Sequence, residues 1–146
     1  MTSDIAIGSA EIRRLTLLTE KLTLRLERET AAFASHRPQD VSAGLVETLD
    51  LANQYRRESA QLKANRALLM AAPSSERMAL IRATERFEAV LATHGRAVEA
   101  ARVISEGLVR TIAHEVSAAR ALGTGYGASG HAAQGDGRAI TYNRTA

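Results

Sequence analysis

The sequence predicts an all-α protein, a long antiparallel bundle or coiled coil of three helices with a flexible glycine-rich C-terminal tail. Apolar residues recur at three- and four-residue spacing along most of the chain. Aromatic residues make up 3% of a chain that is 45% hydrophobic, which suits thin helix-on-helix seams. Two prolines, Pro38 and Pro73, divide the pattern into three segments. We expect the bundle to occupy residues 1–122 and the tail residues 123–146.

The first helix is expected at about residues 9–36, after a short frayed arm that ends at Gly8. Ser9 is a candidate N-cap, and Glu11 follows in the first turn, where the helix dipole favours a carboxylate. The helix should end before Pro38, because the residue preceding a proline is pushed out of the α region. Its apolar positions fall on one face: Ile12, Leu15, Leu18, Leu22, Leu26 and Phe33.

The second helix is expected at about residues 40–71, with Asp40 as its cap and Pro73 beyond its end. The third is expected at about residues 75–122, opened by Ser74 or Ser75. The turns between the three helices are short, so neighbouring helices should run antiparallel.

The third helix is the longest, about 48 residues or roughly 70 Å if unbroken. Its seam positions are Leu80, Thr84, Phe87, Leu91, His94, Val98, Ala101, Ser105, Leu108, Ile112, Glu115, Ala119 and Leu122. The first two helices are shorter, so the far end of the third can lack an internal partner. We therefore take Leu108, Ile112, Val116 and Leu122 as a candidate binding strip for an amphipathic helix. In the alternative interpretation, these residues complete the core against the other two helices.

The character of the chain changes after Leu122, because residues 123–146 contain six of the ten glycines and no leucine or valine. Such a composition disfavours a helix and predicts a flexible segment. Two of the three tyrosines, Tyr126 and Tyr142, lie in this tail.

Charge and composition exclude several classes of function. The net charge is +3, but basic and acidic residues alternate, as in Arg25, Glu27, Arg28 and Glu29, which indicates a solvated helix face rather than a nucleic-acid surface. There is no cysteine, and no run reaches the ~18 apolar residues of a membrane span. The first residues lack the layout of a signal peptide, so we expect a cytoplasmic protein.

No catalytic or metal-binding constellation is apparent. His114-Glu115-Val116 is similar to the phosphoacceptor box of sensor histidine kinases, but the proline that follows that box is missing. The four histidines are scattered, and a His-Glu-x-x-His helix would need a histidine at Ala118. We therefore expect neither enzymatic activity nor a metal or other cofactor. A histidine phosphotransfer module using His114 is the least favoured hypothesis.

Several segments resemble the FlgN-type flagellar export chaperones. They are Glu47–Asp50 and Asn53–Leu62 in the second helix, Ala97–Leu108 in the third, and Tyr126-Gly127-Ala128-Ser129-Gly130 just after it. The asparagines common in the last helix of that family are not found around His94–Arg102.

The resemblance implies a cytosolic chaperone that binds hook-associated subunits and delivers them to the flagellar type III export apparatus. Leu108, Ile112, Val116 and Leu122 would then bind the client, and Tyr126, Gly127 and Gly130 would dock to the export gate or its ATPase components. The alternative is a structural or regulatory helical protein that associates with itself through the same strip.

Overall fold

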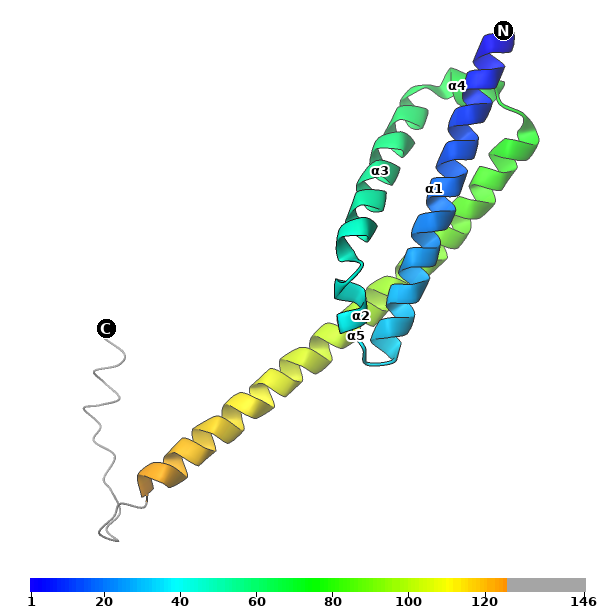
Figure 1. Cartoon of the computed structure of the whole chain (residues 1–146). Coiled ribbons are helices and arrows are strands. Elements are labelled where there is room, and N and C mark those ends of the chain that lie inside the picture. The colour runs from blue at the N-terminus through cyan, green and yellow to red at the C-terminus, as the bar shows by residue number, and fades with distance from the viewer. Residues whose placement is uncertain (126–146) are drawn as a thin grey trace, which may run out of the picture. The chain divides into compact units, whose positions relative to one another are not determined.

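The computed structural model describes residues 1–125, with side chains described for residues 1–123. Within this range there are five α-helices and no strand: α1 (Thr2–Ala34), α2 (Gln39–Ser42), α3 (Leu45–Ala64), α4 (Arg66–Ala71) and α5 (Ser74–Gly125) (Figure 1). The prediction of an all-α protein is confirmed.

The chain divides into two compact units, Met1–Ala101 and Arg102–Ala146. The first unit contains α1 to α4 and the beginning of α5. The described part of the second unit consists of the remaining α5 residues, 102–125. We describe each unit separately.

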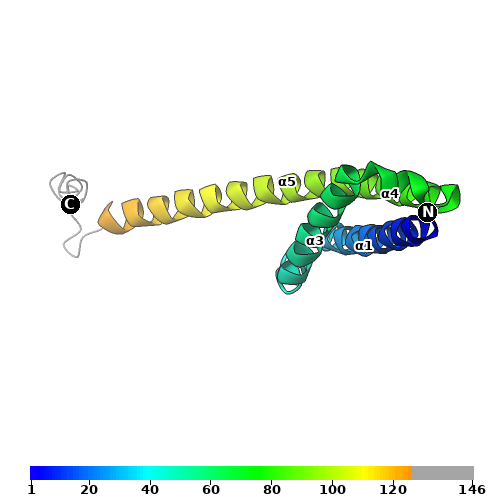
Figure 2. The ribbon, with the colours of Figure 1, turned by 90° about the horizontal axis from the view of Figure 1, so that it is seen from above.

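Within the first unit, α1 lies beside α3 and beside the beginning of α5 (Figures 1 and 2). Arg25 contacts Thr48 and Arg14 contacts Glu58, so α1 and α3 run antiparallel. The contacts to α5 advance along both helices together, from Ser9 with Glu76 to Thr30 with His94, so α1 and α5 run parallel.

Two small hydrophobic clusters hold these helices together, and the predicted face of α1 supplies most of both. Near the N-terminal end of α1, the buried residues are Ile12, Leu15, Leu18, Leu62 and Ala72. Further along α1, they are Leu22, Leu26 and Phe87. Leu51 and Tyr55 of α3 are half-buried against both clusters. Burial of each large side chain contributes about 1.5–3 kcal/mol.

The expectation of a frayed arm over residues 1–8 is wrong, because α1 begins at Thr2. Gly8 and Ser9 are buried, and the backbone of Gly8 lies directly against that of Leu68 at α4. Ser9 does not cap the helix. Its hydroxyl donates to Oε2 of Glu76 at 2.6 Å, so the contact with α4 and α5 holds the first turns of α1 in place.

The second predicted helix is not continuous. A break at Ala43 and Gly44 separates α2 from α3, and Asn65 separates α3 from α4. Asn65 stops α3 and caps α4, since its side chain accepts a hydrogen bond from the Leu68 amide at 3.4 Å. Asp40 lies inside α2 and pairs with Arg37 at 3.1 Å instead of capping a long helix.

The turn after α1 also differs from the expectation. His36 adopts a left-handed conformation with φ of 56°. This allows the Arg37 amide to bond the Ala32 carbonyl at 2.8 Å and ends α1 two residues earlier than predicted. At the other boundary, α5 begins at Ser74, as the sequence predicted, and continues to Gly125 rather than ending at Leu122.

Candidate partner-binding surface

The helical residues of the second unit carry many exposed aliphatic side chains. All side chains from Arg102 to Gly123 are exposed. Of the residues predicted to bind a client, Leu108 is 59% exposed, Ile112 50%, Val116 45% and Leu122 67%. Such a dense set of exposed aliphatic residues on one helix is the usual mark of a protein contact surface.

Helical geometry gathers these residues into one strip. At about 100° per residue, six of them fall within an arc of roughly 140°. We name this set the apolar strip; its members are Ile104, Leu108, Val109, Ile112, Val116 and Leu122. The sequence identified four of the six. Val103, which is 57% exposed, lies on the opposite side of the helix.

The other side of this helix is polar and internally paired. Glu106 is contacted by Arg102 at 3.0 Å, one turn before it, and by Arg110 at 3.7 Å, one turn after it. These i,i+4 pairs support the helix modestly and leave the charges in solvent. The helix from Arg102 onward is therefore amphipathic.

One charged residue, Glu115, lies inside the apolar strip. It stands seven residues after Leu108 and seven before Leu122, so the three share one line along the helix. Glu115 belongs to the three-and-four series found in the sequence, but its charge on that face was not recognised as informative.

The predicted docking residues Tyr126, Gly127 and Gly130 lie outside the described residues, as does most of the predicted tail, 123–146. His114 is exposed on the side of the helix away from the strip. Within residues 1–123, no group of three or more histidine and acidic side chains is placed to hold a metal ion. None of the described helices is long and apolar enough to cross a bilayer.

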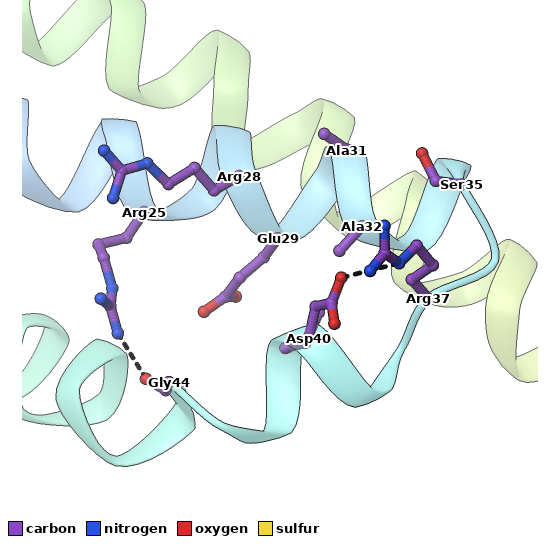
Figure 3. Close-up of a pocket in the computed structure, with 10 residues that line it drawn as sticks. Arg25, Arg28, Glu29, Ala31, Ala32, Ser35, Arg37, Asp40 and Gly44 are labelled. Carbon is purple, nitrogen blue, oxygen red and sulfur yellow. Dashed lines mark hydrogen bonds and ion pairs between the residues drawn. The ribbon is translucent and has the colours of Figure 1, made fainter.

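The first unit contains a pocket of about 330 Å³ between the end of α1 and α2, lined by both charged and apolar residues (Figure 3). Arg25 reaches across it and donates to the Gly44 carbonyl at 2.6 Å, and it also pairs with Glu47 at 2.9 Å. Arg37 pairs with Asp40. Arg25 thus ties the start of α3 to α1, and the Arg37–Asp40 pair lies at the turn between α1 and α2.

A polar network next to this pocket joins three helices. Thr48 of α3 donates to Glu29 of α1 at 2.6 Å and accepts from Arg25 at 3.3 Å. On the other side, His94 of α5 lies 3.7 Å from Glu29 and 3.2 Å from the hydroxyl of Thr30.

The sequence interpretation of Arg25 and Glu29 as part of a solvated charged face is therefore wrong. Their side chains are only 24% and 11% exposed. Nothing in the local charge pattern distinguishes them from Arg28, which is exposed, or from Glu27, whose side chain is 39% exposed and pairs with Arg86 of α5.

A second, more apolar groove of about 430 Å³ lies along the first turns of α5. Leu69, Met78, Leu80 and Ile81 line it, with Glu85 and Glu88 at one end. It is a weaker candidate than the apolar strip, because two of these residues already belong to the core: Leu69 and Leu80 pack against the first cluster.

Comparison with known proteins identifies the family. The chain is 46% identical over 138 residues to the flagellar basal-body protein FlbY of Caulobacter vibrioides, and the match covers 92% of this chain and 93% of that protein. No family model matches the chain, and no solved structure matches it.

This relationship overturns the resemblance to FlgN-type chaperones, and with it the prediction that the protein is an export chaperone for hook-associated subunits. Three of the resembling segments, Glu47–Asp50, Asn53–Leu62 and Ala97–Leu108, lie in amphipathic helices, whose composition is shared by unrelated helical proteins, and the fourth, Tyr126–Gly130, lies outside the described residues. The flagellar connection is retained, because the relative is itself a flagellar protein. The chain belongs to the FlbY family of flagellar basal-body proteins.

Proposed function

We propose that this protein acts at the flagellar basal body as a non-enzymatic binding protein, and that it uses the apolar strip to bind a helical segment of a basal-body component. Membership in the FlbY family supports the flagellar setting. The apolar strip supports the mode of action, since an amphipathic helix with an uncovered apolar face pairs with another helical surface.

The single observation that carries the proposal is the exposure of the strip. Its members are between 45% and 67% exposed, and Ile104 and Val109 fall within that range. Burying a large aliphatic side chain fully is worth about 1.5–3 kcal/mol. A micromolar complex requires about 8 kcal/mol. Because the six residues are already about half covered, burying the rest of them is worth roughly 5–10 kcal/mol before the cost of association is subtracted, so the strip supplies part of the binding free energy and other contacts supply the remainder.

The proposal includes two expectations from the sequence: the absence of catalysis and a cytoplasmic location. Among the described residues, the polar clusters are occupied in joining helices, as in the Glu29–Thr48–Arg25 network. Cell fractionation with immunodetection of the chromosomally encoded protein tests the location.

The test compares substitutions on the two sides of one helix. Leu108→Ser removes a strip residue that is 59% exposed, and Val103→Ser removes a residue of the opposite side that is 57% exposed. Both side chains are in solvent within the chain, so neither change should lower the free energy of unfolding by more than about 0.5 kcal/mol. Each variant replaces the chromosomal copy, and swimming in soft agar and co-sedimentation with purified basal bodies are measured.

We expect Leu108→Ser, and more strongly Leu108→Ser combined with Ile112→Ser, to reduce both swimming and co-sedimentation. Val103→Ser should behave as the unmodified protein. An equal loss of swimming and co-sedimentation in Val103→Ser would refute a role for the strip. If the unmodified protein does not co-sediment with basal bodies at all, the proposed function is wrong.

A further inference from the structure

One charged residue, Glu115, limits the kind of partner surface that can cover the apolar strip. Leu108, Glu115 and Leu122 follow one another at seven-residue steps, about two helical turns apart. A partner surface that contacts both leucines therefore passes over Glu115 as well. The carboxylate loses water when the two leucines are buried.

The chain itself offers Glu115 no basic side chain on this helix. On a helix, the neighbours of a residue stand three and four positions away. For Glu115 these are Thr111, Ile112, Ala118 and Ala119, and none is basic. Glu106, on the opposite side, has an arginine one turn before it and one turn after it. Arg102 and Arg110 thus pair with the acid of the polar side, whereas Glu115 has no basic residue one turn before or after it on the helix.

An unpaired carboxylate is costly to bury, whereas one paired with a cation and correctly hydrogen-bonded is tolerated and fixes the register of the two surfaces. We infer that the partner helix places an arginine or lysine opposite Glu115, flanked by apolar residues that cover Leu108 and Leu122. This inference rests on the proposed function, because it names the partner chemistry of the same strip.

A second copy of this chain fits the strip less well. In a parallel pair of two such helices, Glu115 would stand against its own counterpart, and like charges at a buried seam disfavour the complex. An antiparallel pair avoids this contact, so self-association becomes one outcome of the test. Binding of a wholly apolar partner would be weakened by Glu115, because the carboxylate would be buried without a cation.

The experiment measures co-sedimentation of the full-length protein with purified basal bodies for Glu115→Gln and Glu115→Leu. Leu108→Ser and Val103→Ser serve as the positive and negative controls. Glutamine keeps the size and a hydrogen-bond acceptor but removes the charge, so its effect isolates the charge. Sedimentation velocity of each purified variant alone reports self-association.

We expect Glu115→Gln to weaken binding by about tenfold or more, as measured for desolvated charge pairs, and Glu115→Leu to weaken it at least as much. If Glu115→Gln binds as tightly as the unmodified protein, or if Glu115→Leu binds more tightly, the inference is wrong.

The control variants distinguish a failure of this inference from a failure of the proposed function. Loss of binding in Leu108→Ser with unchanged binding in Glu115→Gln would overturn this inference and leave the proposed function standing. Unchanged binding in Leu108→Ser would overturn both. A concentration-dependent dimer that Leu108→Ser dissociates would show that a second copy covers the strip, and would also overturn the inference.

Discussion

Replacing Gly8 with alanine is expected to destabilise the protein, although alanine is the better helix former. A Cβ at this position would collide with the carbonyl oxygen of Leu68, and the carbonyl carbon and Cα of Leu68 lie 3.2 and 3.5 Å from it. These are backbone atoms, which cannot rotate away, so α1 and α4 must move apart. Such overpacking costs about 1–3 kcal/mol, whereas the helix gains about 1 kcal/mol from glycine to alanine.

Gly95 provides the matched control. It lies in the interior of α5, is exposed, and has nothing within 4 Å of the place where a Cβ would stand. Gly95→Ala should therefore raise the free energy of unfolding by about 0.5–1 kcal/mol, while Gly8→Ala lowers it by about 1 kcal/mol.

Urea titrations followed by far-UV circular dichroism measure both changes, provided that the slope of the transition is the same in all three proteins. The decisive result is the opposite sign of the two shifts in midpoint. If Gly8→Ala stabilises the protein as much as Gly95→Ala does, the beginning of α1 does not pack against α4. The packing described for Gly8 and Ser9 would then be wrong.

Two further predictions concern the first unit. Ile12→Ala, at a position that is 0% exposed, should lower the free energy of unfolding by about 2–5 kcal/mol in the same titration. Its control Ile81→Ala, at a position that is 48% exposed, should lower it by less than about 1.5 kcal/mol. Similar losses in the two variants would mean that the core is not centred on α1. Thr48→Val removes the hydroxyl that joins Glu29 to Arg25 and should lower the free energy of unfolding by about 1–3 kcal/mol. Its control Ser42→Ala removes a hydroxyl that bonds only the nearby Gln39 carbonyl and should lower it by less than about 0.5 kcal/mol. Equal effects would show that the network does not hold α1 to α3.

The sequence was most informative about α1 and the start of α5. The spacing of Ile12, Leu15, Leu18, Leu22 and Leu26 predicted the buried face of α1, because a helix places residues three and four apart on the same side. The proline at position 73 and the serine after it correctly predicted the beginning of α5.

The apolar periodicity of residues 40–71 was insufficient to predict where the second helix breaks. Gly44 and Asn65 fall within a pattern that reads as continuous, and a single glycine or asparagine inside such a pattern is compatible with an unbroken helix. The breaks occur because α2 and α4 turn toward α1, where Arg25 bonds the Gly44 carbonyl and Leu68 lies against Gly8. These contacts join residues 19 and 60 positions apart, and local propensity does not contain them.

For the candidate site, the sequence supplied Leu108, Ile112, Val116 and Leu122 and the amphipathic character of the helix. It did not supply their exposure, which depends on what else packs against them. It also suggested a family that the comparison with FlbY corrected, because amphipathic helices resemble one another in composition whatever they bind.

The sequence by itself thus determined that residues 1–125 are largely helical and which side of α1 and of α5 is apolar, since both follow from interactions within a few residues. Only the tertiary structure decided which apolar sides are covered. The face of α1 is buried because α3 and the beginning of α5 lie against it, and Glu29 is drawn inside because Thr48 and His94 meet it there. The strip from Ile104 to Leu122 has the same periodicity, yet it remains exposed within the described residues. That difference in burial, invisible in the spacing, distinguishes a core from a candidate binding surface.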